Sequence, residues 1–233
     1  MSRSVVEVLE RPTLKQPTAI LGSPGLRSVG KVAVEKLIQF LKPRMFARLY
    51  SAHFPAVHFT KPSYAADPKL LGEGGVKVTN GIGNLPSVEF YYSTMPELVI
   101  SIGYHANFKG QYLTAEQVLD FYNEIGVKRV VVLAGYGHKG DEVCCAGTDA
   151  QIMEEMKVFG LRAGYEGAFF GFSGLVFGLC QPRKIKGICL FGRSEPTPND
   201  PESPDPDAAE KLLMKTCEVV GLEYKTQSTA SGL

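Results

Sequence analysis

Residues 129–133 form an almost uninterrupted apolar run that reads Arg-Val-Val-Val-Leu. Antiparallel strands with one solvated face alternate apolar and polar residues, whereas a strand buried on both faces reads as a continuous apolar run. Such strands belong to parallel sheets, whose crossover connections place helices on both sides. The run therefore predicts an α/β domain in which helices cover both faces of a sheet.

The sequence on either side of this strand alternates between helical and strand patterns. Thr114 and Gln117 have the spacing of a capping box, which predicts a helix that begins at Thr114. A further helix is expected to open at residues 148–151, and a buried one over residues 171–180. A strand is expected to follow over residues 185–191, where β-branched and apolar residues return.

The last helix has a clear beginning and end. Asp205 and Pro206 fit an N-cap and a first helical residue, and Gly221 fits the residue that ends the helix. Residues 226–233 are small and polar. We therefore expect a single α/β domain over residues 1–222 and a flexible C-terminal tail over residues 223–233.

The first half of the chain supplies more strands than helices. A short buried strand over residues 18–22 leads into an amphipathic helix, which Pro43 stops. Residues 1–17 are expected to form an edge strand or arm. Aromatic and β-branched residues predict middle strands at 45–50, 76–79, 88–92 and 98–102. The expected sheet is mixed and mostly parallel.

Composition excludes several classes of function. The formal net charge is +1, which argues against a protein that binds nucleic acid through a basic surface. The longest apolar stretch, residues 167–180, is interrupted by glycines and is too short to cross a bilayer. The five cysteines include no CxxC pair, so we expect no metal site and reduced thiols in a cytoplasmic protein. We also expect no cofactor.

A phosphate-binding motif is nearly present after the first buried strand. Residues 25–32 read Gly-Leu-Arg-Ser-Val-Gly-Lys-Val, close to the pattern GxxxxGK(S/T). Val32 stands where that motif needs a hydroxyl group for Mg²⁺, so nucleotide hydrolysis is not expected. The turn either holds a small anion at the helix N-terminus or makes a close contact between helix and sheet.

A second glycine loop follows the strand at 129–133, and its histidine is the best acid–base candidate in the chain, although a solvated loop histidine is the favoured interpretation. Ser173 sits in a near match to the nucleophile-elbow pattern, but a packing role is favoured because Leu175 replaces the last glycine. No catalytic residue is assigned. The candidate ligand-binding residues from both loops are Gly22, Pro24, Gly25, Gly30, Lys31, Gly135, Gly137 and His138.

Five segments in order resemble the proteasome assembly chaperone family. They are the turn at 22–31, the strand and glycine loop at 130–140, the Gly-Phe-Ser-Gly-Leu stretch at 171–175, the Cys-Leu-Phe-Gly strand at 189–192 and the helix start at 204–209. The resemblance spans about residues 18–222. The chain departs from the family at Arg27, where many members have glycine, and it lacks a terminal hydrophobic-Tyr-x tail.

This resemblance implies a nucleoside-phosphorylase-like α/β fold and a non-enzymatic chaperone or adaptor that binds proteasome core subunits, the α subunits among them. It also implies a homo-oligomer of three to five subunits. The alternative is a nucleotide- or nucleoside-type binding protein or enzyme on the same fold, which would use the turn at residues 22–30.

The aromatic middle of the chain offers a separate argument for assembly. Phe90, Tyr91 and Tyr92 are consecutive, so their side chains must point to alternating faces of a strand. Unless another layer covers the second face, at least one ring leaves the core. Exposed aromatic clusters of this kind mark contacts between subunits or with partners.

Overall fold

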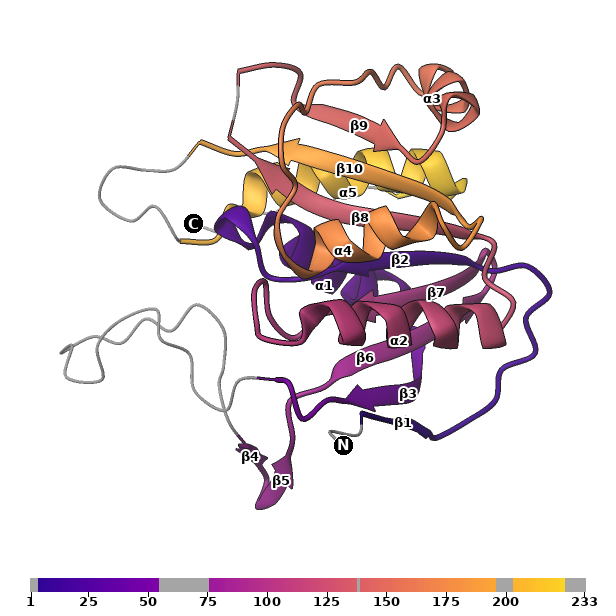
Figure 1. Cartoon of the computed structure of the whole chain (residues 1–233), viewed down its shortest axis with the longest axis vertical. Coiled ribbons are helices and arrows are strands. Elements are labelled where there is room, and N and C mark those ends of the chain that lie inside the picture. Colours follow the sequence, from indigo (N-terminus) through magenta and orange to yellow (C-terminus); the bar gives the residue numbers. More distant parts are fainter. Residues whose placement is uncertain (1–3, 55–75, 138, 196–202, 225–233) are drawn as a thin grey trace, which may run out of the picture.

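The computed structural model describes residues 4–54, 76–137, 139–195 and 203–224. They form one α/β unit built on an eight-stranded sheet, with a separate two-stranded ribbon (Figure 1). The elements in chain order are β1 (Val5–Val8), β2 (Thr18–Gly22), the 3-10 turn η1 (Leu26–Ser28), α1 (Val29–Leu41), β3 (Arg44–Tyr50), β4 (Lys77–Thr79), β5 (Ile82–Asn84), β6 (Val88–Thr94), β7 (Glu97–Ile102), α2 (Gln111–Glu124), β8 (Arg129–Tyr136), β9 (Val143–Gly147), α3 (Ala150–Lys157), α4 (Gly171–Cys180), β10 (Lys186–Arg193) and α5 (Pro206–Val220).

The sheet is mixed, as expected, and has the strand order β1-β3-β6-β7-β2-β8-β10-β9. Its centre is parallel, because β2 pairs with β7 and β8, and β8 pairs with β10. The remaining pairs are antiparallel, so parallel pairing is less extensive than expected. For the β6–β7 pair the reason is local, because a tight turn joins the two strands and brings the chain back antiparallel.

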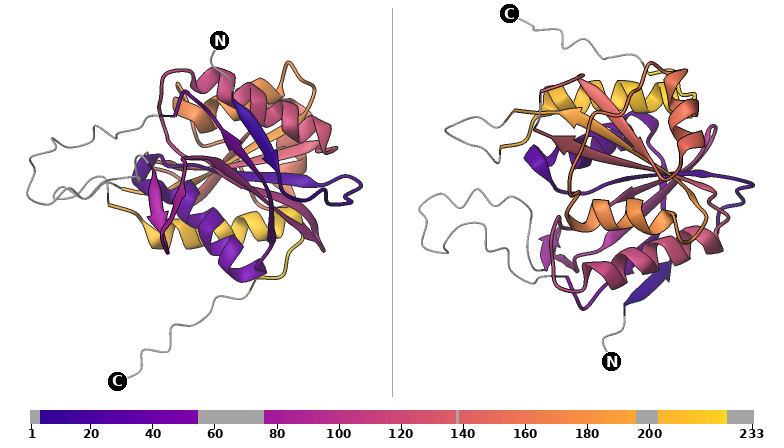
Figure 2. Two further views of the ribbon diagram at one scale, coloured as in Figure 1. Left: turned by 90° about the horizontal axis from the view of Figure 1, so that it is seen from below. Right: turned by 45° about the horizontal axis from the view of Figure 1, so that its top comes forward.

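Helices cover both faces of the sheet, which confirms the α/β prediction. Figure 2 shows α2 and α4 on one side and α1 and α5 on the other. The central strand β8 alternates between the two cores. Val130 and Val132 lie in the core beneath α2 and α4, and Val131 and Leu133 lie in the core beneath α1 and α5. All four side chains are buried, as the apolar run predicted.

The sequence predicts both ends of α5 correctly but misplaces the start of α2. For α5 the prediction is confirmed: the Asp205 side chain accepts a hydrogen bond from the Ala208 N–H, and Gly221 ends the helix at a φ of +70°. For α2 it is wrong. The helix begins at Gln111, and Thr114 lies buried within the first turn, where its hydroxyl donates to the Gly110 carbonyl instead of capping the helix.

The consecutive aromatic residues of β6 stay within the chain. Phe90 is fully buried, and Tyr92 packs against the same core as Phe90. Tyr91 points the other way and packs against the core beneath α1 and α5. The helices supply the second covering layer, so these rings give no argument for assembly. Of the other middle aromatics, those within residues 55–75 lie outside the described residues.

The N-terminal segment contributes β1, which forms one edge of the sheet, as expected. Near the C-terminus, Tyr224 packs edge-on against Phe40 with ring centroids 4.9 Å apart, and its hydroxyl donates to Glu210. Packed chain therefore reaches at least residue 224. Among the described residues, no helix is both long and apolar enough to cross a membrane.

Candidate functional site

A cavity of about 480 Å³ lies where the parallel strands β2, β7 and β8 end. The chain leaves β2 for α1 on one face of the sheet and leaves β7 for α2 on the other face. Neighbouring parallel strands whose connections diverge in this way open a crevice at their carboxyl ends, which is the usual ligand position in open α/β sheets. Residues from segments 23–30, 105–107, 134–135 and 165–173 line the cavity.

Two serine side chains meet at one wall of this cavity. Ser23 directly follows β2 and is 3% exposed, and Ser173 lies in the first turn of α4 and is 8% exposed. Their hydroxyl oxygens are hydrogen-bonded at 2.6 Å. Ser173 was expected to pack inside an apolar helix. The structure instead joins it to the turn after β2.

The first turn of α4 is held against the loop that follows β7. The Phe172 N–H donates to the Ala106 carbonyl at 2.8 Å. Gly171 has a φ of +88°, which a residue with a side chain adopts only with strain. A Cβ at this position would also press on the Ala106 carbonyl oxygen. The glycine therefore lets α4 begin at the cavity edge.

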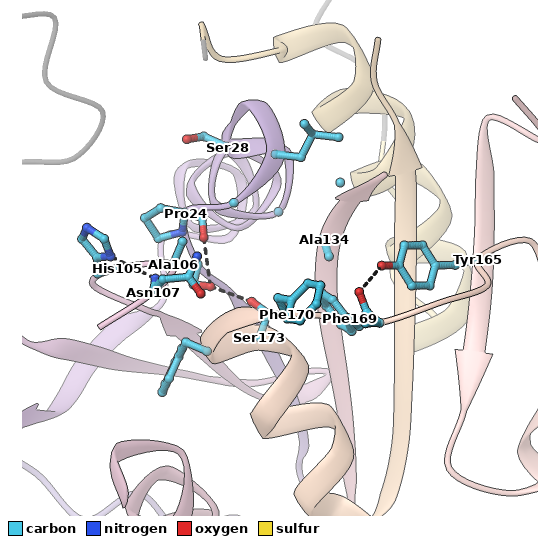
Figure 3. A pocket seen from close by; sticks show the side chains of 17 residues that line it. Pro24, Ser28, His105, Ala106, Asn107, Ala134, Tyr165, Phe169, Phe170 and Ser173 are labelled. Atoms are coloured by element: carbon cyan, nitrogen blue, oxygen red, sulfur yellow. Dashed lines mark hydrogen bonds between the residues drawn. The ribbon is translucent and has the colours of Figure 1, made fainter. Parts of the chain in front are cut away.

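The cavity has a polar side and an aromatic side (Figure 3). His105 and Asn107 lie on the polar side, where the Asn107 N–H donates to His105 Nδ1 at 3.0 Å. Phe169, Phe170 and Tyr165 lie on the opposite side, beyond Ser173. The Tyr165 ring stacks on a buried phenylalanine of β10 with centroids 4.7 Å apart, and its hydroxyl donates to the Ala168 carbonyl.

Four of the glycine-loop residues singled out from the sequence line the cavity: Pro24, Gly25, Gly30 and Gly135. Gly30 also has a packing role, because a Cβ there would overlap the Leu133 carbonyl oxygen of β8.

The other candidates do not line the cavity. A Cβ at Gly22 would overlap the Gly30 carbonyl oxygen, so this position makes a close contact between strand and helix. Lys31 forms an ion pair with Glu35 at 2.5 Å, one turn along α1. Gly137 is not among the lining residues, and His138 lies outside the described residues.

No sequence motif singled out His105 and Asn107, which lie in the loop after β7. Tyr165, Phe169 and Phe170 were also missed, because they read as an irregular segment between helices. These residues reach the cavity through the pairing of β7 and the docking of α4, which are long-range contacts.

Arg27 ties the cavity loop to the start of α5. Its guanidinium donates to the Ser203 and Glu195 carbonyls at 2.8 Å and pairs with Asp205 at 3.1 Å. Burial raises the pKa of Asp205, but hydrogen bonds from the Ala208 N–H and the Ser194 hydroxyl and the charge of Arg27 outweigh burial, so the pKa lies below its usual value. Asp205 is therefore ionised at neutral pH.

The cysteines are buried and carry protonated thiols at neutral pH. Burial raises the pKa of Cys145 to about 11 and that of Cys180 to about 12, and the pKa of Cys144 is raised by burial as well. Since the thiolate is the reactive form, these groups are inert toward ordinary thiol chemistry. In the part of the chain that the structure describes, no group of three or more His, Cys, Asp or Glu side chains is placed to hold a metal ion.

Comparisons with known proteins give a consistent result. The model of the PAC2 family matches residues 19–230. An uncharacterized protein of Methanocaldococcus jannaschii is 26% identical over 237 residues, which cover 92% of this chain and 78% of that protein.

Solved structures agree. Pyrococcus furiosus PbaB, an archaeal proteasome activator, is 29% identical with a TM-score of 0.77, and the match covers 97% of this chain and 92% of that one. Pyrococcus furiosus PbaA, an archaeal homolog of proteasome-assembly chaperone, shares the fold at 19% identity with a TM-score of 0.74, over 97% of this chain and 89% of that one. The resemblance inferred from the sequence is confirmed, and the chain belongs to the PAC2 family.

Proposed function

We propose that the protein is a cytoplasmic, non-enzymatic chaperone or adaptor that binds proteasome core subunits, with the α subunits as its direct partners. The observation that carries this proposal is the similarity to the proteasome activator PbaB, which extends over 97% of the chain at 29% identity. Similarity over the full domain supports a shared binding role more strongly than a shared fold does, because one fold hosts many functions.

We further propose that the protein acts as a homo-oligomer of three to five subunits. The β4–β5 ribbon projects from the body of the domain (Figure 1). Val78 is 68% exposed and Ile82 is 66% exposed, and the register places them on opposite faces of the ribbon. An isolated two-stranded ribbon is marginally stable in water, and exposed apolar side chains of this kind suit a protein contact. The ribbon is the contact we assign to a second copy.

Light scattering coupled to size exclusion tests the assembly at micromolar concentration. We expect a mass of three to five times 25.4 kDa. The double variant Val78→Ser with Ile82→Ser should lower the mass. Met95→Ser, at a side chain that is 86% exposed in the β6–β7 turn, should leave it unchanged. A wild-type protein that elutes as a 25.4 kDa monomer would contradict the assembly.

Proteasome binding is tested with the immobilised full chain and core particles from the same host. We expect saturable binding of intact core particles and of isolated α subunits, and none of isolated β subunits. Failure to bind either the core particle or the α subunits at micromolar concentrations would contradict the proposed function.

A further inference from the structure

The cavity beside β2, β7 and β8 has the size of a small-molecule site. The hollow opens to solvent on one side, where Phe170 is exposed, and its volume is about 480 Å³. Pockets that hold small ligands have volumes of about 300–1,000 Å³ and combine apolar walls with a few convergent polar groups. The serine pair and the aromatic side supply both features.

Among the described residues that line the cavity there is no lysine, arginine, aspartate or glutamate, and His105 is the one lining side chain that can carry a positive charge. The two cations of its own loop are engaged outside it, Arg27 with Asp205 at 3.1 Å and Lys31 with Glu35 at 2.5 Å. A phosphate or carboxylate held between the serine pair and the aromatic side, away from His105, would lose water without gaining a paired charge, which is unfavourable. The lining therefore suits an uncharged ligand.

The serine pair offers mainly hydrogen-bond acceptors to such a ligand. Each hydroxyl has one donor and two acceptor lone pairs. The mutual bond occupies one donor, and the Ser23 hydroxyl also lies 3.4 Å from the Pro24 carbonyl. The oxygens keep lone pairs after these bonds are made. A buried acceptor is best satisfied by an N–H or O–H group on the ligand.

The aromatic side favours a flat ligand. Phe169 and Phe170 lie next to Ser173 in the cavity (Figure 3). Aromatic faces stack on planar rings, and stacking requires no charge on either partner. A ring that lies against these side chains can direct its polar edge toward the serine pair.

We propose that this cavity binds an uncharged planar heterocycle with N–H groups on its edge, the chemical class of free nucleobases and unphosphorylated nucleosides. The N–H edge donates to the Ser23 and Ser173 hydroxyl oxygens, and the ring packs against Phe169 and Phe170. This binding role is independent of the proteasome and needs no cofactor.

Calorimetric titration of the full chain tests the proposal directly. The probes are adenine, cytosine, uracil and the four common ribonucleosides, with inorganic phosphate and AMP as charged comparisons. We expect at least one uncharged probe to bind saturably below millimolar concentration. The same nucleoside with a 5′-phosphate should bind at least about tenfold more weakly, because the phosphate finds no countercharge.

Two variants, each with a matched control, locate the site. Ser173→Ala should weaken binding about fivefold by removing one hydrogen bond. Its control is Ser101→Ala, a fully buried hydroxyl in β7 that accepts a hydrogen bond from Tyr122 outside the cavity. Phe170→Ala should weaken binding about fivefold or more through lost stacking. Its control is Met95→Ala, since both side chains are more than 80% exposed and both variants should fold.

The results separate the possibilities. Weaker binding in both cavity variants and unchanged binding in both controls would support the proposal. No saturable heat from any uncharged probe at millimolar concentration would overturn it. Tighter binding of phosphate or AMP than of the nucleosides, or binding that neither cavity variant alters, would overturn it as well. Thermal melts of all variants verify that each is folded.

Discussion

The guanidinium of Arg27 lies 3.1 Å from the carboxylate of Asp205, although 178 residues separate them in the chain. The two side chains are only 12% and 17% exposed, so the pair is largely withdrawn from water. Asp205 also caps α5 through the Ala208 N–H. One ion pair therefore joins the loop that lines the cavity to the start of the last helix.

Arg27→Ala should lower the free energy of unfolding by about 3 kcal/mol at pH 7, because it leaves a buried carboxylate without its partner. Urea unfolding measures the change. Lys31→Ala is the matched control, since it breaks the more accessible Lys31–Glu35 pair within one helix and should cost less than about 1 kcal/mol. Equal effects of the two variants would contradict the role assigned to Arg27.

The contribution of Asp205 should depend on pH. Its folded-state pKa lies below its ordinary value of 3.8, so the ionised form is stabilised by folding. That stability is fully present above the unfolded pKa and is lost as the pH falls through the folded pKa. The difference in unfolding free energy between wild type and Asp205→Asn should stay constant from pH 7 to about 5 and shrink below about pH 4. A difference that grows on acidification would show that folding raises the pKa of Asp205 instead of lowering it.

Gly30→Ala should destabilise the fold by at least about 2 kcal/mol, because the new Cβ overlaps the Leu133 carbonyl oxygen and pushes α1 away from β8. Thermal or urea unfolding gives the measurement. Gly178→Ala is the control, since this exposed position in α4 has open space around it and alanine is the better helix former. The free energy of unfolding of that variant should rise by about 0.5–1 kcal/mol. A neutral Gly30→Ala would mean that helix and strand are not in backbone contact.

No Mg²⁺-dependent binding of ATP is expected. Val32 packs its methyl groups against the core beneath α1 and α5 and offers no ligand to a metal ion. Lys31, the lysine of the near-motif, is paired with Glu35. Calorimetry with ATP and Mg²⁺ should show no saturable heat at micromolar concentration. Tight binding that Lys31→Ala abolishes would revive the phosphate-loop interpretation.

Tyr224 should contribute to the stability of the fold, whereas residues 226–233 should not. Deletion of residues 226–233 should leave the melting temperature within about 2 °C of wild type, because this segment contains only one large apolar residue, Leu233. Tyr224→Ala should lower stability by about 1–2 kcal/mol through the loss of the Phe40 contact and the hydrogen bond to Glu210. A large loss on deletion would show that residues beyond 225 also pack.

Some elements escaped prediction because tertiary contacts outweigh local pattern. Thr114 and Gln117 match a capping box, yet α2 begins earlier, at Gln111. The Thr114 side chain is buried, and its hydroxyl is hydrogen-bonded to the Gly110 carbonyl and to the Ser51 hydroxyl, so it does not cap the helix. β9 was missed, since its sequence Val-Cys-Cys-Ala-Gly has no alternation. It forms because β10 offers it an edge, which no local signal encodes.

The sequence by itself determined the elements whose causes are local. The apolar run of β8 requires burial on both faces, the spacing of apolar residues sets α1, and Asp205, Pro206 and Gly221 set the ends of α5. Only the tertiary structure decided the site. Ser23 and Ser173 are 150 residues apart, and they meet because β2 and β7 pair in parallel while α4 docks on the loop after β7. Local interactions act over a few residues, whereas a cavity needs walls from distant segments, so its chemistry emerges only when the sheet assembles.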